Sequence, residues 1–353
     1  MNKILITGIA GFVGSRLATF FKEHDSSIQI IGIDNLSRRG SETNLHLLKQ
    51  LGCTFVHGDI RSKEDIEELP KVDWVIDCAA IPTVTAGLLG GTRQMIDHNL
   101  TGTLNLLEKC RRDTSGFIIL STSRVYSIPA LASLPLEEGD TRYQLSVDKG
   151  LVGCSSRGID HNFSTQAPVS LYGATKLASE TMALEYGEAF GFPVWINRCG
   201  VIAGAGQFGK IDQGIFSFWI YQWLLKKPLA YIGFGGTGKQ VRDFFSPQDL
   251  AQLLLKQIKD PNRKVPKILN VGGGLDSSMS LFELSQFCRE HLNHDIELGR
   301  VPETRSFDIP WYVTDNTLVS QYWGWQPMES KESLLQSIME YARENKSIIN
   351  NGF

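Results

Sequence analysis

The sequence predicts an α/β protein: a Rossmann-like, doubly wound parallel sheet with a smaller α/β lobe that binds the substrate. Over the first 200 residues, short strand-like runs alternate with amphipathic stretches. The strand-like runs are apolar along their length, which is typical of parallel strands buried on both faces. A glycine-rich turn between Gly8 and Gly14 joins the first run to the first amphipathic stretch. Together these features predict a sheet with helices on both faces.

Six strands and three long helices are expected in this first part. The strands are predicted from runs rich in β-branched and aromatic residues, at 3–7, 29–33, 54–57, 74–77, 117–121 and 194–197. The helices are predicted at Phe12–Glu23, Arg93–Arg112 and Leu171–Phe190. Residues 127–168 show neither period, and a connection of this length is usually functional or mobile. We expect it to lie over the substrate; the alternative is a surface insertion.

The composition changes after Arg198, where glycine-rich runs and an aromatic stretch begin. The expected elements of this part are helices at 215–225, 247–258, 281–292 and 332–345, and a strand at 267–270. We therefore predict a dinucleotide-binding domain over residues 1–200, to which 241–270 returns. Residues 201–240 and 271–353 are predicted to form the substrate-binding lobe.

Composition and charge exclude several classes of function. The hydrophobic fraction of 42% and the charged fraction of 21% are those of a globular protein. A net charge of −3 gives no sign of binding to nucleic acid or to an anionic membrane, and no apolar run approaches the ~20 residues that span a bilayer. The N-terminus lacks the features of a signal peptide, and the six cysteines form no Cys-x-x-Cys pair. We expect a cytoplasmic protein with reduced thiols. His291 and His294 have no partner ligand nearby in sequence, so we expect no metal.

The glycine-rich turn carries the first functional prediction. Thr7-Gly-Ile-Ala-Gly-Phe-Val-Gly14 follows a predicted strand and opens a predicted helix. Glycines allow a tight turn and let a pyrophosphate approach the positive end of the helix dipole. The spacing is G-x-x-G-x-x-G, and tight helix–strand packing alone is the alternative interpretation. The cofactor contacts predicted here are Gly8, Gly11, Phe12 and Gly14.

Residues at the ends of later strands indicate which dinucleotide is bound. Asp34 ends the second strand, where a carboxylate accepts hydrogen bonds from ribose hydroxyls and repels a 2′-phosphate. Arg38 could attract that phosphate, but Asp34 lies directly at the strand end, so NAD is predicted over NADP. The other cofactor contacts predicted here and after the third and fourth strands are Asn35, Arg38, Asp59, Ile60, Ala79 and Ala80.

Tyr172 and Lys176 are the predicted catalytic pair. They lie four residues apart in a predicted helix, so their side chains share one face. An ammonium group near a phenol favours the phenolate, which could take a proton from a sugar hydroxyl while a nicotinamide takes the hydride. Thr122, at the end of the fifth strand, is predicted to hold the reacting oxygen; an ordinary strand-end hydroxyl is the alternative. Arg242 is predicted to bind a diphosphate, or else to form a surface pair with an aspartate.

Three motifs carry a resemblance to a known family. Thr-Gly-x-x-Gly-Phe-x-Gly at 7–14, Tyr172-Gly-Ala-Thr-Lys176 and Arg242-Asp-Phe244 resemble the extended short-chain dehydrogenases/reductases, in particular the nucleotide-sugar epimerases and dehydratases. The resemblance covers nearly the whole chain. It implies that Tyr172 is the base and that Lys176 lowers its pKa and holds the nicotinamide ribose. It also implies that Asn99 contacts NAD.

A narrower resemblance is to the CDP-paratose (CDP-tyvelose) 2-epimerases. It rests on runs that include Asp34-Asn-Leu-Ser-Arg-Arg-Gly40, Thr141-Arg-Tyr143 and Gly238-Lys-Gln-Val-Arg-Asp243. It implies inversion of C2 of a CDP-linked deoxyhexose through a transient keto sugar. The substrate contacts it implies are Arg242, Gln207, Tyr143 and Arg305. The alternatives are a UDP-sugar 4-epimerase or other nucleotide-sugar oxidoreductase of this family, and a non-catalytic NAD-binding sensor.

Two further implications follow from the resemblance. The family's 4,6-dehydratases have Asp-Glu after the strand-end threonine, whereas Ser123 and Arg124 follow Thr122 here, so dehydration is not expected. The predicted helices 93–112 and 171–190 carry apolar residues on more than one face, and family members pair such helices in a dimer. We therefore expect a homodimer or homotetramer; the alternative is that both helices are buried within one subunit.

Overall fold

A computed structural model describes residues 3–82, 91–146, 151–210 and 213–350 of the chain, which forms two compact units. Unit 1 comprises 1–125, 171–199 and 247–269, and unit 2 comprises 126–170, 200–246 and 270–353. These units differ from the predicted domains, because the 126–170 connection and residues 241–246 belong to unit 2. Unit 2 is consequently as large as unit 1 and is not the smaller lobe that we expected.

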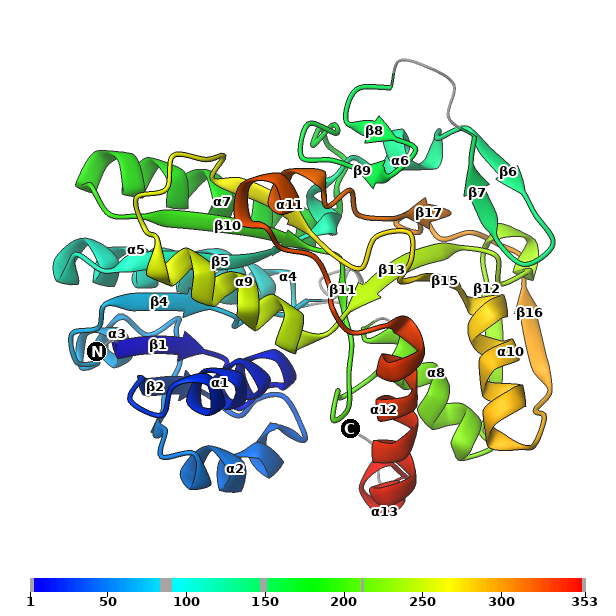
Figure 1. Ribbon diagram of the computed structural model, residues 1–353, viewed down its shortest axis with the longest axis horizontal. Helices are drawn as coiled ribbons and strands as arrows, with labels where there is room; N and C mark the ends of the chain where they lie inside the picture. The colour runs from blue at the N-terminus through cyan, green and yellow to red at the C-terminus, as the bar shows by residue number, and fades with distance from the viewer. Residues whose placement is uncertain (1–2, 83–90, 147–150, 211–212, 351–353) are drawn as a thin grey trace. The chain divides into compact units, whose positions relative to one another are not determined.

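Unit 1 contains the predicted parallel sheet (Figure 1). Its seven strands have the order β14-β10-β5-β4-β1-β2-β3, and the pairings from β10 to β3 are parallel. The strands are β1 (Lys3–Thr7), β2 (Gln29–Asp34), β3 (Thr54–His57), β4 (Trp74–Asp77), β5 (Gly116–Thr122), β10 (Val194–Cys199) and β14 (Ile268–Val271). The fold class is therefore confirmed, and the strand order reverses between β1 and β4, where ligands of doubly wound sheets bind.

The helices of unit 1 lie between these strands in sequence. They are α1 (Phe12–His24), η1 (Ser41–Asn44), α2 (Leu45–Gln50), α3 (Lys63–Glu67), α4 (Thr92–Ile96), α5 (Gly102–Asp113), η3 (Ser123–Val125), α7 (Ser170–Phe190) and α9 (Pro247–Lys259). The single helix predicted at 93–112 is divided, because a π-helical segment, η2 (Asp97–Thr101), separates α4 from α5. Leu171 and Phe190 on α7 are exposed, and pairing of the two long helices with a second copy stays a prediction.

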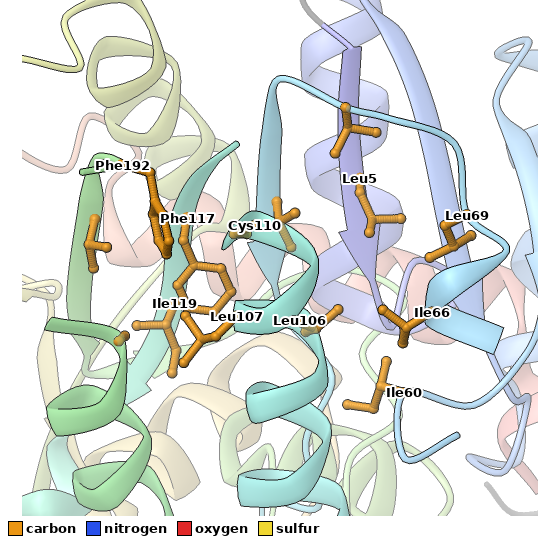
Figure 2. Close-up of a cluster of buried hydrophobic side chains, with 14 of the residues drawn as sticks. Leu5, Ile60, Ile66, Leu69, Leu106, Leu107, Cys110, Phe117, Ile119 and Phe192 are labelled. Carbon is orange, nitrogen blue, oxygen red and sulfur yellow. The ribbon is translucent and has the colours of Figure 1, made fainter. Parts of the chain in front are cut away.

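Alternate residues of each strand build two apolar layers, as the pleat of a sheet requires. Leu5 belongs to a cluster in which strand residues pack against α3, α5 and α7 (Figure 2). Its neighbours Ile4 and Ile6 are fully buried but lie outside that cluster, on the other face of β1. The helices α1 and α9 pack against each other, and Figure 1 shows both on one side of the sheet.

Unit 2 is built from short strands and an aromatic core. Its strands are β6 (Leu136–Glu138), β7 (Tyr143–Leu145), β8 (Cys154–Ser155), β9 (Gly158–Ile159), β11 (Val201–Ile202), β12 (Leu229–Ile232), β13 (Val241–Phe245), β15 (Ser278–Ser280), β16 (Leu298–Val301) and β17 (Trp311–Tyr312). Its helices are α6 (Ile128–Ala132), α8 (Ile215–Leu224), η4 (Phe234–Gly236), α10 (Leu281–Leu292), α11 (Thr317–Trp323), α12 (Lys331–Glu344) and α13 (Lys346–Asn350). Trp219 and Trp223 of α8 and Phe244 of β13 are buried in one cluster with α10 and α12.

Membrane-spanning helices and clusters of metal ligands are both absent from the described ranges. None of the helices described there has both the length and the apolar character required to cross a membrane. The side chains described there also include no group of three His, Cys, Asp or Glu that could hold a metal ion. His294 lies instead between two backbone carbonyls, those of Leu292 and Trp223, at 2.8 and 2.9 Å.

Candidate active site

The glycine turn between β1 and α1 leaves no space for side chains. Gly8 has a φ of +61°, and a Cβ there would lie 3.2 Å from the Cα of Ala79. A Cβ on Gly14 would lie 2.4 Å from the carbonyl oxygen of Gly8. The N–H of Gly11 donates to that same oxygen at 2.9 Å. The glycines are therefore needed for the close approach of the turn to α1 and to the end of β4.

The start of α1 is suited to an anion. The helix begins at Phe12, which is buried, and Gly11 before it provides no side-chain cap. The first turn of α1 contains no acidic residue of its own, and an anion is stabilised at the positive end of a helix dipole. A glycine-rich turn followed by an uncapped helix start fits the diphosphate of a dinucleotide.

Asp34 supports the glycine turn in addition to its predicted role. Its carboxylate accepts hydrogen bonds from the N–H groups of Ala10 and Leu36, at 3.0 and 2.8 Å. Burial raises the pKa of Asp34, and these bonds oppose the rise. The Asn44 amide donates to the carbonyl of Ala10 at 2.9 Å, a contact that no sequence pattern predicted. Arg38 is half-buried on the same connection.

The residues that follow β3 divide between the surface and the core. Asn35 donates to the Asp59 carboxylate at 2.8 Å, and Arg61 binds that carboxylate through two nitrogens. The Arg61 side chain holds the pKa of Asp59 well below its usual range. The Ile60 side chain lies in the apolar cluster (Figure 2), and its carbonyl accepts from Asn105. The predicted contact between Ile60 and the cofactor stays a prediction.

A buried hydrogen-bond network fixes the end of β4. The Thr7 hydroxyl donates to Asp77 at 2.9 Å and accepts from the N–H of Ala79 at 3.0 Å. The Thr103 hydroxyl donates to the other oxygen of Asp77 at 2.8 Å. Ala79 and Ala80 are half-buried after the strand. The network holds this connection beside the glycine turn.

Asn99 is fully buried in the π-helical segment. Its amide oxygen accepts from the N–H of Ile81 at 2.8 Å, and its amide nitrogen donates to the Thr175 hydroxyl at 3.2 Å. Asn99 therefore ties the connection after β4 to α7. The implied contact between Asn99 and NAD stays a prediction.

The predicted catalytic residues come together at the carboxyl end of β5 and the first turns of α7. Tyr172 and Lys176 lie one turn apart in α7, and both are buried. The Thr122 hydroxyl is hydrogen-bonded to the Tyr172 phenol. Burial raises the pKa of the Cys199 thiol to about 12, and the Lys176 charge opposes that rise, so the Lys176 ammonium lies near the end of β10.

The acidity of Tyr172 differs from the prediction. Burial raises the pKa of Tyr172 to about 12, whereas its bond to Thr122 and the charge of Arg124 lower it. Burial of the phenol thus has a larger effect on this pKa than the bond to Thr122 and the charge of Arg124. Arg124 was expected only to take the place of a dehydratase acid, and its charge acts on Tyr172 as well.

Two of the predicted substrate residues have partners within unit 2. Arg242 donates to the carbonyls of Val241 and Ile309, both at 2.7 Å, so its guanidinium is held on the backbone. Gln207 is buried; its nitrogen donates to the carbonyl of Ile202 and its oxygen accepts from the Ser217 hydroxyl, both at 2.8 Å. These bonds give Gln207 a structural role, and its contact with a substrate stays a prediction.

Phe234 contacts both Tyr143, on β7, and the residue before Arg305. The Tyr143 ring makes an edge contact with Phe234, with centroids 6.3 Å apart. The N–H of Phe234 donates to the Thr304 hydroxyl at 2.8 Å, next to Arg305. Arg305 forms a bidentate pair with Asp308 at its exposed position. Within unit 2, Tyr143 and the segment that carries Arg305 therefore contact the same residue, Phe234.

Asp243 provides a prediction about stability. It is fully buried on β13, and a Cβ on Gly272 would lie 2.3 Å from its carboxylate. Burial raises its pKa to about 6, so the folded state holds the Asp243 proton more tightly than the unfolded state does. Asp243 therefore stabilises the fold least above pH 6, and stability is lost as the pH rises from about 4 to 6. Asp243→Asn should reduce this loss by up to about 3 kcal/mol, measured by urea unfolding between pH 4 and 8.

A matched variant separates burial from a general loss of charge. Asp140 is an exposed carboxylate of the same unit, so Asp140→Asn should leave the pH dependence of unfolding unchanged. Equal curves for Asp243→Asn and the wild type would contradict the prediction.

Comparisons with known proteins agree with this geometry. The model of the NAD-dependent epimerase/dehydratase family matches residues 4–272. The CDP-paratose 2-epimerase of Salmonella typhi is 31% identical over 350 residues, which cover 96% of this chain and 98% of that protein. A UDP-glucuronate 4-epimerase of Thermodesulfobacterium geofontis is 28% identical over 99% of this chain and 98% of its own.

A solved structure supports the fold. The UDP-glucuronic acid 4-epimerase of Bacillus cereus, in complex with UDP-glucuronic acid and NAD, superimposes with a TM-score of 0.77. It is 24% identical, and the match covers 97% of this chain and 99% of that one.

Proposed function

The chain belongs to the NAD-dependent epimerase/dehydratase family, and we propose that it inverts C2 of a CDP-linked deoxyhexose of the paratose/tyvelose type through a transient keto sugar. The observation that carries this proposal is the full-length similarity to a CDP-paratose 2-epimerase. The residues at the ends of β5 and α7 support it, because a phenol bonded to a strand-end hydroxyl can handle the proton of a sugar hydroxyl. The position after Thr122 holds serine and arginine, so no acid is available there to eliminate water.

Each group of residues has a distinct part in this proposal. The glycine turn and the start of α1 would hold the diphosphate of NAD, and Asp34 its adenosine ribose. Bound NAD+ would supply a reversible hydride acceptor and a positive ring charge. Tyr172 takes the proton of the C2 hydroxyl, while Thr122 orients the same oxygen. Arg242 carries the positive charge that would meet the diphosphate of the substrate.

The test is a panel of nucleotide sugars. Purified protein is incubated with CDP-paratose, CDP-tyvelose, UDP-glucose, UDP-glucuronate and dTDP-glucose in D2O, and the inverted carbon is located by NMR. We expect interconversion of the two CDP sugars without deuterium at C2, because a transferred hydride returns to the same carbon. Inversion at C4 of a UDP sugar would instead support the 4-epimerase alternative, which the UDP-glucuronate 4-epimerase similarity favours. NAD binding without turnover of any sugar would support the sensor.

A further inference from the structure

A buried ion pair joins α7 to two strands of the sheet. The Arg198 guanidinium donates to the Glu180 carboxylate through Nη2 at 2.7 Å and through Nε at 3.1 Å to each oxygen. The Ser121 hydroxyl donates to the same carboxylate. The side chains of Arg198 and Glu180 are only 5% and 2% exposed. One carboxylate of α7 therefore holds β5 and β10 at the same time.

The strand residues of this network lie directly before the catalytic end of the sheet. In the β10–β5 register, Arg198 is paired with Ser121, and the next pair is Cys199 with Thr122. Thr122 is hydrogen-bonded to the Tyr172 phenol. The Glu180 contacts are thus one residue along each strand from the group that holds Tyr172.

Tyr172 and Lys176 share a face of α7 with Glu180. The three residues follow one another at intervals of four along the helix, so they lie in one row. Any rotation or sliding of the helix that moves the Glu180 carboxylate therefore also moves the phenol. A helix rises about 1.5 Å per residue, so an axial shift by one residue would move the phenol about that far from Thr122.

The described apolar cluster on this face of the sheet includes residues from the second half of α7. The buried residues of α7 are Tyr172, Gly173, Thr175, Lys176, Ser179, Glu180 and Ala183. The apolar cluster of this face of the sheet includes Ala183, with Met182 and Leu184 partly buried, but none of the earlier turns. Hydrophobic contacts are not directional, so directional hydrogen bonds are needed where the apolar residues end.

A second set of bonds acts on a neighbouring row of α7. The Asn99 amide donates to Thr175 at 3.2 Å, and the Ser179 hydroxyl donates to the carbonyl of Asn99 at 2.8 Å. These bonds connect α7 to the π-helical segment, whereas Glu180 connects it to the sheet. Of these two sets of bonds, the one made by Glu180 reaches β5, the strand that carries Thr122, through Ser121.

We propose that Glu180, acting through Arg198 and Ser121, is a positioning residue that sets the register of α7 on the sheet and so places the Tyr172 phenol on the Thr122 hydroxyl. A misplacement of about 1 Å in a reacting group costs on the order of 10²-fold in rate. The kinetic consequence depends on the proposed function. The structural consequence, a fixed first half of α7, does not.

The test replaces the whole pair, because a single change would leave a buried charge without its partner. The variant Glu180→Leu/Arg198→Met should fold and keep NAD. Its kcat on the CDP sugars should fall by about 10- to 100-fold, with KM changed less than about threefold. The rising limb of its pH profile should move to higher pH, because loss of the Thr122 bond raises the pKa of Tyr172.

A second readout needs no substrate. In hydrogen-exchange mass spectrometry of the NAD-loaded protein, amides of residues 170–181 should exchange about tenfold faster in the variant than in the wild type. If the wild type turns over none of the CDP sugars, the proposed function fails while this measurement still decides the proposal about positioning.

A matched control removes another buried ion pair of unit 1. Lys109 and Asp113 of α5 are 2.6 Å apart and nearly inaccessible, and Lys109 also binds the carbonyl of Pro70, before β4 begins. The pair therefore lies near the amino-terminal end of β4, whereas Tyr172 lies by Thr122 at the carboxyl end of β5. Lys109→Met/Asp113→Leu should keep the wild-type kcat, pH profile and exchange in 170–181.

Two further results would decide the proposal: a comparison of the two double variants, and the effect of a single substitution at Ser121. Equal kcat, pH profile and exchange in the Glu180/Arg198 variant and in the control would overturn it. If the Glu180/Arg198 variant does not fold, Ser121→Ala removes one contact of the carboxylate and should lower kcat about three- to tenfold with faster exchange in 170–181. A Ser121→Ala protein identical to the wild type in both measurements would also overturn it.

Discussion

Replacing Tyr172 by phenylalanine should lower kcat by about 10²- to 10⁴-fold, because the phenol is the proposed base for the proton of the substrate hydroxyl. Phenylalanine keeps the buried ring, which is 7% exposed, and loses only the hydroxyl that is bonded to Thr122. The fold and the amount of bound NAD should therefore be unchanged. Steady-state rates on the CDP sugars and native mass spectrometry of the bound cofactor measure the two quantities.

A tyrosine of the same helix provides the control. The Tyr186 hydroxyl donates to Glu108 at 2.7 Å at an exposed position, so Tyr186→Phe should keep the wild-type rate. If Tyr172→Phe also turned over within about threefold of the wild type, Tyr172 would not be the base.

A methyl group at Gly14 should abolish NAD binding. The added Cβ would lie 2.4 Å from the carbonyl oxygen of Gly8 and 2.7 Å from the Cα of Ile9, and backbone atoms cannot move away as a flexible side chain can. The turn must therefore shift away from α1, which removes the surface predicted to receive the diphosphate. We expect at least about a hundredfold loss of affinity for NAD by calorimetry, and destabilisation of about 1–3 kcal/mol.

Gly52→Ala distinguishes this effect from the ordinary cost of replacing a glycine. Gly52 has a φ of +68° and no atom within 4 Å of an added Cβ, so the substitution strains the backbone without a collision. The affinity of the Gly52→Ala protein for NAD should stay at the wild-type value. A Gly14→Ala protein with the same affinity as Gly52→Ala would show that this glycine is not needed at the cofactor site.

The sequence predicts unit 1 well because its signals are local. The structures of apolar runs such as 74–77 and of the glycine turn can be predicted from a few neighbouring residues. The strands β1, β3 and β4 begin and end at the predicted residues. The division of the helix at Asp97–Thr101 was missed, because the bonds of Asn99 to Ile81 and Thr175 join residues that are far apart in the sequence.

Unit 2 could not be predicted to the same extent, because distant contacts define it. Arg142 binds Glu283, at the start of α10, through two nitrogens. The two residues are 141 positions apart, and a local sequence pattern cannot predict a contact over that separation. Strands as short as β8 and β11 carry too few residues to show a period. The run Thr141-Arg-Tyr143 marks a resemblance, and the structure shows that its first two residues anchor Tyr143 to α10.

The predicted role of Asp34 in cofactor selectivity is combined with a structural role in the loop that is predicted to receive the cofactor. A redesign toward NADP would ordinarily begin by removing this carboxylate, which is predicted to repel the 2′-phosphate. Here the same carboxylate fastens the backbone at Ala10 and Leu36, so its removal would loosen the loop before any phosphate bound. An engineer should therefore retain Asp34 and add positive charge farther along the connection, beginning at Ser37.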